Sequence, residues 1–134
     1  MTQIRIRDAA QFLGVSDDTV RRWLDGGVLA ARSDAHGRKV IDGKVLAEFI
    51  KSRAAPVQDP SPIGRSARNR FVGLVTAVTS DPVMSQVELQ CGPHRVVSLM
   101  STEAVRELDL APGVVAVAVV KATQVIVETS AALS

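Results

Sequence analysis

The sequence predicts an α+β protein of two small domains, and three observations support this fold class. Residues 1–53 place apolar side chains at helical spacing, whereas residues 66–130 are valine-rich segments separated by turn residues. Between them, residues 54–65 contain three prolines, a glycine and a serine, a composition typical of a linker. A chain of 134 residues suits one average domain or two very small ones, and these patterns favour two.

Composition excludes several classes of protein. Hydrophobic residues make up 46% and charged residues 22%, as in ordinary globular domains. No apolar run is long enough to cross a bilayer, and the first residues contain no apolar signal-peptide core. A single cysteine, Cys91, excludes an intrachain disulfide. We therefore expect a cytoplasmic protein that has no membrane partner.

The charge is unevenly distributed along the chain. Residues 1–53 carry ten Lys or Arg against seven Asp or Glu, a net charge of +3. Residues 71–134 carry three against six, a net charge of −3. This asymmetry suggests that any contact with nucleic acid lies in the first domain.

The first domain is predicted to begin with two short helices. In the first, Ala9, Ala10, Phe12 and Leu13 share roughly one face, and a glycine at position 14 ends the helix. Ser16 is a good N-cap for the second helix, which the glycines at 26 and 27 end. The residues of this second helix expected to face inward are Val20, Trp23 and Leu24.

A hairpin and a third helix are predicted to follow. We expect a short strand near residues 28–30, and then a tight turn between two extended pieces in the sequence SDAHGRKVI. The sequence DGKVLAEFIKSRA is typical of a helix with one apolar face.

The second domain is predicted to consist of strands and one short helix. The expected strands are 70–78, 85–91, 94–100, 113–120 and 124–128. The segment 114–120 fits a strand buried on both faces, which suggests burial against a partner subunit because about 65 residues form only a marginal core. In the helix STEAVRELDL, Ser101 or Thr102 can act as the cap.

Residues 3–52 resemble the winged helix-turn-helix domain of MerR-like regulators and phage excisionases. The resemblance is carried by the sequence AAQFLGVSDDTVRRWLDGGVLAARSDAHGRKVI. It implies binding to double-stranded DNA, with the second helix in the major groove and the hairpin as a wing. The candidate DNA-binding residues are Ser16, Thr19, Arg21, Arg22, His36, Arg38 and Lys39. Alternatively, Arg21 and Arg22 are solvated surface charges, or the domain binds another protein.

The rest of the chain resembles the Mop domain, also called molbindin or TOBE. The matching pieces are SARNRFVGLVTAV, VVSLMSTEAVRELDLAPG and VVAVAVVKATQVIV. The resemblance implies a small OB-like β-barrel that exchanges a strand between subunits and binds molybdate or tungstate at the subunit interfaces. It also implies a homo-oligomer, either a dimer or a hexamer built as a trimer of dimers.

The same resemblance implies a set of oxyanion-binding positions. One subunit supplies Ser66, Ala67 and Arg68, and a second supplies Ser101, Thr102, Ala104, Lys121, Ala122 and Thr123. A hydroxyl and a guanidinium on one face of an extended strand suit a dianion. The family commonly has a hydroxyl where this chain has Ala104, which weakens the match. Alternatively, Ser66 only ends the linker, Arg68 makes a surface ion pair, and Lys121 extends from a sheet edge.

These interpretations favour a molybdate-responsive or tungstate-responsive DNA-binding transcriptional regulator. A molybdate-storage protein with an accessory helix-turn-helix domain is one alternative. A recombination or nucleoid accessory factor that has lost the ligand is another. The sequence shows no nucleophile–base pair and no phosphate-binding loop, so we do not expect an enzyme. Cys91 and His94 are too few ligands for a structural zinc site.

Overall fold

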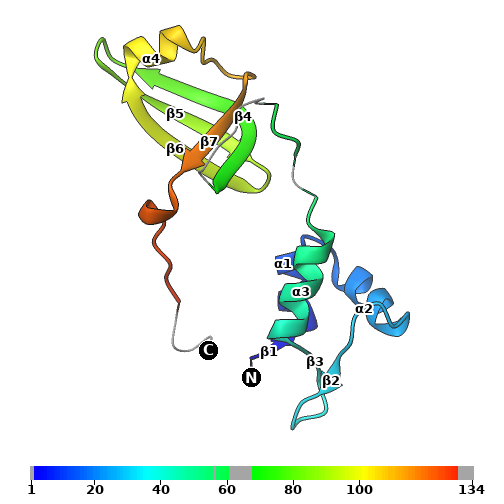
Figure 1. Cartoon of the computed structure of the whole chain (residues 1–134). Coiled ribbons are helices and arrows are strands. Elements are labelled where there is room, and N and C mark those ends of the chain that lie inside the picture. The colour runs from blue at the N-terminus through cyan, green and yellow to red at the C-terminus, as the bar shows by residue number, and fades with distance from the viewer. Residues whose placement is uncertain (1, 56, 61–67, 130–134) are drawn as a thin grey trace. The chain divides into compact units, whose positions relative to one another are not determined.

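The computed structural model describes residues 2–55, 57–60 and 68–129 and has a mixed α+β fold. The chain divides into two compact units, one built mainly from residues up to Pro56 and the other from Val57 to Val127 (Figure 1). Each unit has its own apolar core. None of the helices in these ranges has the length and apolar character that crossing a bilayer requires.

The front unit combines three helices with a small antiparallel sheet. Its elements in chain order are β1 (Gln3–Arg5), α1 (Ile6–Leu13), α2 (Asp17–Asp25), β2 (Arg32–Ser33), β3 (Lys39–Asp42) and α3 (Gly43–Arg53). The strand order is β1-β3-β2, so the two strands of the β2–β3 hairpin are joined by a strand from the start of the chain. Sequence reasoning missed β1, which is only three residues long, although its polar and apolar side chains alternate.

The helix pair forms as its capping residues predict. Gly14 ends α1 in a left-handed conformation with φ of 68°, which a residue without a Cβ adopts without strain. The Ser16 side chain accepts a hydrogen bond from the Thr19 backbone N–H at 3.2 Å and so caps α2. The predicted end of the first helix at Gly14 and the predicted start of the second at Ser16 are therefore confirmed.

The front core lies between the helices and the sheet. Its buried members are Ile6, Ala9, Ala10, Val20, Leu29, Ile41 and Leu46. Trp23 packs at the edge of this cluster with its ring centroid 5.3 Å from that of Phe49, and the Arg53 guanidinium lies 4.6 Å above the indole. The expectation that Phe12 faces this core is wrong, because its side chain is 65% exposed.

The strand expected at residues 28–30 is also wrong. The backbone N–H groups of Val28 and Leu29 both donate to the carbonyl of Trp23, at 2.9 and 3.2 Å. This segment therefore closes the end of α2, since the last carbonyls of a helix lack partners within it. The strand begins only at Arg32.

The rear unit is a curled antiparallel sheet with one short helix. Its elements are β4 (Asn69–Ser80), β5 (Met84–Cys91), β6 (His94–Ser101), α4 (Thr102–Glu107), β7 (Val115–Val120) and a 3-10 turn, η1 (Ala122–Gln124). The strand order is β6-β5-β4-β7. Figure 1 shows β4 bending strongly across the other strands.

The bend in β4 lets one strand serve two neighbours. Residues 69–74 pair with β7, residues 74–80 pair with β5, and the register shifts between Val75 and Ala77. Gly73 lies where the backbones approach closely, because a Cβ there would overlap the Gln90 carbonyl and the Cys91 sulfur. The buried core beneath is formed by Val75, Val87, Leu89, Cys91 and Val105.

The strand expected at residues 124–128 is wrong. The chain makes the 3-10 turn and then continues without regular structure, with Ile126 85% and Val127 87% exposed. The strand β7 is an edge strand, because among the described residues it pairs only with β4. Its Val115 and Val119 are exposed within one chain, so the expected burial of this strand against a partner subunit stays a prediction.

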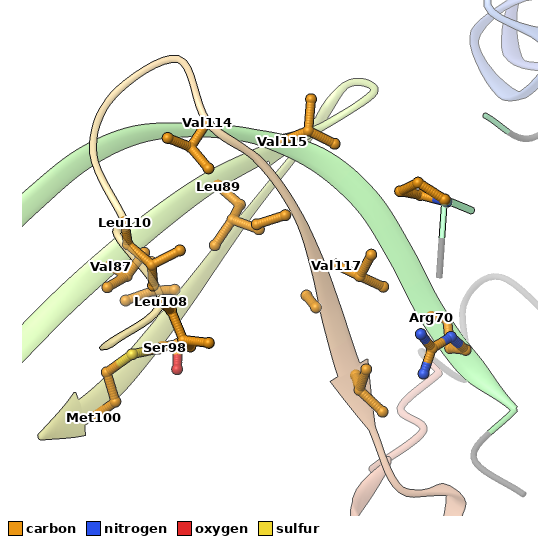
Figure 2. A pocket seen from close by; sticks show the side chains of 15 residues that line it. Arg70, Val87, Leu89, Ser98, Met100, Leu108, Leu110, Val114, Val115 and Val117 are labelled. Atoms are coloured by element: carbon orange, nitrogen blue, oxygen red, sulfur yellow. The ribbon is translucent and has the colours of Figure 1, made fainter. Parts of the chain in front are cut away.

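An apolar groove lies on the rear unit, beside β7. It has a volume of about 690 Å³ and is lined mainly by β5, β6, β7 and the segment 108–114. Figure 2 shows the side chains of Leu89, Val114 and Val117 directed into it, with Arg70 at one end. The sheet is therefore curled and not closed into a barrel within the described part of the chain.

Candidate functional site

The exposed face of α2 carries a connected set of polar side chains. Ser16 Oγ lies 2.9 Å from Thr19 Oγ1, and Arg22 Nη2 donates to that same Thr19 oxygen at 3.1 Å. This contact holds Arg22 in one orientation, so less side-chain entropy is lost when it binds a ligand. Arg21 is exposed beside it. Four of the seven candidate DNA-binding residues thus lie on α2 or at its cap.

The β2–β3 hairpin is held by Asp34. Its Oδ1 accepts hydrogen bonds from the backbone N–H groups of His36 and Arg38 at 2.8 and 2.9 Å. Its Oδ2 accepts from Arg38 Nε at 3.1 Å, and Gly37 supplies the positive φ of 78° that the turn requires. Sequence reasoning missed Asp34, although an Asp at the first position of a turn is a recognisable signal. The exposed side chains that the hairpin presents are His36, Arg38 and Lys39.

One basic depression lies on the front unit. It has a volume of about 420 Å³ and is lined by Arg5, Ile6, Arg7, Asp17, Arg21, Arg38 and Lys39. Three of these cations were expected to contact DNA. Arg5 and Arg7 were not, because sequence reasoning did not recognise that β1 packs beside the hairpin.

On the rear unit, the candidate oxyanion-binding residues fall into two sets. The first begins with Ser66 and Ala67, which lie outside the described residues. Arg68 directly precedes β4 and Lys121 directly follows β7, and both side chains are exposed. Asn69 is paired with Val120, so Arg68 and Lys121 occupy the next opposed positions and emerge at the same end of the ladder. Lys121 was expected from a second subunit, but within the chain it lies beside Arg68. Ala122 and Thr123 follow in η1 and are exposed.

The second set lies at the start of α4. Ser101 Oγ accepts a hydrogen bond from the Ala104 backbone N–H at 3.1 Å, so Ser101 is the N-cap. Thr102 is only 4% exposed: its hydroxyl donates to the Asp81 carbonyl at 2.7 Å and lies 2.8 Å from Ser85 Oγ. Its backbone N–H donates to Val83. Thr102 therefore holds α4 against the β4–β5 turn, and its hydroxyl is engaged by groups of the same chain.

The two sets lie at opposite ends of the sheet. Ser101 is opposed to Met84, next to the end of β4, whereas Arg68 precedes the beginning of β4. A straight strand of twelve residues would span about 36 Å, and even a bent one separates its ends by far more than one oxyanion can bridge. Within one chain, these sets cannot contact the same small ligand.

The donors that are exposed fit a tetrahedral dianion. Arg68 and Lys121 are basic side chains, and across residues 2–55, 57–60 and 68–129 neither has an ion-pair partner. The Ser101 hydroxyl accepts from Ala104 and keeps its own proton to donate. Guanidinium, ammonium and hydroxyl donors are the groups that stabilise oxyanions.

Two carboxyl groups with shifted pKa values lie outside both sets. Hydrogen bonds from the backbone N–H groups of Met84 and Val83 lower the pKa of Asp81. The hydrogen bond from Arg95, at 2.7 Å, and then that from Thr76 lower the pKa of Glu88. Both groups stabilise local structure, one in a turn and one across neighbouring strands.

Cys91 and His94 are opposed residues at the ends of β5 and β6. Cys91 is buried, and its thiol donates to the Phe71 carbonyl at 3.6 Å. No cluster of three or more metal-binding side chains occurs among the described residues.

The chain thus joins a helix-turn-helix unit to a curled β-sheet unit, and each matches a known domain family. Residues 4–54 match the helix-turn-helix domain family, and residues 65–127 match the TOBE domain family. The molybdenum transport protein ModE of Herbaspirillum seropedicae is 37% identical over 65 residues, which are 48% of this chain and 24% of that protein. This chain therefore spans about a quarter of the length of that curated relative.

Solved structures similar to this chain include two small proteins. MopII from Clostridium pasteurianum is 33% identical with a TM-score of 0.46, and the match covers 49% of this chain and 100% of that one. A molybdate-binding protein from Sporomusa ovata is 28% identical with a TM-score of 0.48, and the match covers 50% and 100%.

Proposed function

We propose that this protein is a DNA-binding transcriptional regulator that responds to molybdate or tungstate. The observation that carries the proposal is that one chain joins a helix-turn-helix domain match with a basic exposed face to a TOBE domain match. In addition, a stretch of 65 residues of this chain is 37% identical to a protein named for molybdenum transport. A ligand-binding unit and a DNA-binding unit in one chain suit a sensor.

The proposed DNA-binding surface consists of α2 and the β2–β3 hairpin, in the manner of a MerR-like winged helix. Arg21 and Arg22 project from α2 toward the base edges or phosphates of the major groove, and Thr19 orients Arg22. His36, Arg38 and Lys39 on the hairpin meet the backbone or the minor groove. Ser16 lies at the start of α2, where backbone N–H groups suit a phosphate.

The proposed oxyanion site is assembled from two copies of the chain. Arg68 and Lys121 come from one copy, with Ser66, Ala67, Ala122 and Thr123 as neighbouring positions taken from the family resemblance. A second copy contributes Ser101 and the start of α4 near Ala104. The support for two copies is that these sets lie at opposite ends of the sheet in one chain. The bound oxyanion would supply the negative charge that neutralises the unpaired cations.

Exchange of the segment after β7 is the proposed means of assembly. Val125, Ile126 and Val127 are exposed apolar residues with strand-like composition. The groove between β6 and β7 is apolar, and the free edges of both strands can accept a further strand. A dimer or a hexamer built as a trimer of dimers satisfies this arrangement.

Fluorescence anisotropy of labelled promoter DNA, with and without molybdate, tests the proposed function. We expect operator affinity to change at saturating molybdate, because a ligand that prefers one assembly shifts its population. Native mass spectrometry of the same samples gives assembly size and oxyanion number together. Operator affinity unchanged by molybdate would contradict the regulator. Abundant oxyanion binding without DNA binding would instead favour storage.

A further inference from the structure

A cluster of five cations faces the basic depression on the front unit. They come from four separate elements: Arg5 from β1, Arg7 from α1, Arg21 from α2, and Arg38 with Lys39 from the hairpin. Asp17 is the only carboxylate among the residues that line the depression. The fold thus brings together charges that lie far apart in the sequence.

Most of these cations have no partner among the residues that the structure describes. Arg38 is paired with Asp34, but across the described residues Arg5, Arg7, Arg21 and Lys39 make no ion pair and no side-chain hydrogen bond. Like charges gathered around one hollow repel one another, and an anionic ligand would relieve that repulsion. The arrangement therefore indicates a polyanionic partner.

Arg5 and Arg7 are poor choices for helix stability. Arg5 is the N-cap of α1, and its side chain makes no capping hydrogen bond. Arg7 lies in the first turn, where a positive charge opposes the helix dipole. Two unfavourable residues at one helix start have a physical reason if they contact an anion.

We propose that Arg5 and Arg7 bind the phosphodiester backbone that runs between the two grooves entered by α2 and the hairpin. This inference rests on the proposed DNA-binding function. When a helix enters the major groove and a wing enters the adjacent minor groove, one backbone strand must pass between them. The register of Arg5 with Val40 places β1 directly beside the hairpin, and Arg21 lines the same hollow from α2. The β1–α1 junction is therefore a phosphate-binding element that sequence reasoning did not identify.

The salt dependence of binding measures phosphate contacts directly. The full-length wild-type protein, Arg5→Gln, Arg7→Gln and the double variant are titrated against a fluorescein-labelled random-sequence DNA duplex at several salt concentrations. Each lost contact should reduce the slope of log K against log salt by about 0.9, and the double variant by about 1.8. Arg5→Lys with Arg7→Lys keeps both charges and should restore the slope.

Lys51→Gln is the matched control, because Lys51 is an exposed cation of α3 that does not line the depression. An equal slope in the wild type and the double variant would overturn the inference and leave the proposed function intact. An equal loss in Lys51→Gln would also overturn it, because only net charge would then matter. Absence of DNA binding by the wild type would refute both. If Arg5→Gln loosens β1, as thermal unfolding followed by Trp23 fluorescence would reveal, Arg7→Gln alone decides the question.

Discussion

At the scale of single residues, the structure separates side chains that hold the fold from those that remain available to a ligand. Thr102 and Ser101 are adjacent hydroxyls, and the sequence permits either to cap α4. The structure makes Ser101 the exposed cap and buries Thr102 against Asp81 and Ser85. Sequence reasoning could not distinguish them, because the difference depends on the β4–β5 turn folding back over the helix start.

Replacing Thr102 with valine should destabilise the rear unit by about 1–3 kcal/mol, because it leaves buried polar partners without a donor. Calorimetric unfolding measures the change. Thr79→Val serves as the matched control, since Thr79 is an exposed threonine of β4 and its replacement should change stability by less than about 0.5 kcal/mol. Trp23 lies in the front unit, and the unfolding of that unit, followed by Trp23 fluorescence, should be the same in the wild type and both variants. Equal stability of the two variants would contradict the structural role.

The Asp81 carboxylate should make stability depend on pH in the acid range. Hydrogen bonds from Met84 and Val83 lower its pKa in the folded protein, so the folded state favours the ionised form. Its contribution is therefore complete above the ordinary carboxyl pKa of 3.8 and is lost as the pH falls through the lower folded value. Asp81→Asn should be less stable than the wild type near neutral pH, and the difference should shrink in acid. Urea unfolding at several pH values measures this, and a difference that grows in acid would refute it.

At the scale of elements, short-range signals predicted helices more completely than strands. The caps at Gly14 and Ser16 act within a few residues, and both were recognisable. The strand expected at 28–30 failed because its N–H groups bond to the Trp23 carbonyl, a local competition that apolar composition does not reveal. The prediction of a strand at 124–128 failed for a different reason: a strand needs a neighbour, and the described part of the chain offers none there.

The apolar segment after β7 should be needed for assembly. Ile126→Asp places a charge where the proposed partner groove is apolar. We therefore expect the dissociation constant of the proposed oligomer to rise by at least about tenfold. Sedimentation velocity over a dilution series measures this. Val57→Asp changes an exposed valine at the start of the same unit and should leave assembly unchanged. Dissociation in both variants, or in neither, would count against strand exchange.

At the scale of the whole molecule, the division into two units was predictable because composition and periodicity change together near the linker. The structure places the corresponding boundary between Pro56 and Val57. The candidate oxyanion residues were named from family resemblance, and their grouping was not predictable. It depends on the β4–β7 register, which places Lys121 beside Arg68 and far from Ser101.

Arg68→Gln or Lys121→Gln should weaken the response to molybdate, so that more molybdate is needed for it, without changing the affinity for DNA in its absence. Each replacement removes a charge-assisted contact, so molybdate affinity should fall by about tenfold or more. Isothermal titration calorimetry and DNA anisotropy measure the two effects separately. Arg106→Gln, at an exposed arginine of α4, should retain both activities. A full response in Arg68→Gln and Lys121→Gln would exclude these residues from the site.

The separation of Arg68 and Lys121 from Ser101 has a consequence for how a cell would use the protein. The proposed pocket needs two copies, so it is absent from a solitary chain, whatever the amount of oxyanion. The response would then depend on the concentration of the protein as well as on the concentration of the oxyanion. A cell could silence the response simply by making fewer molecules.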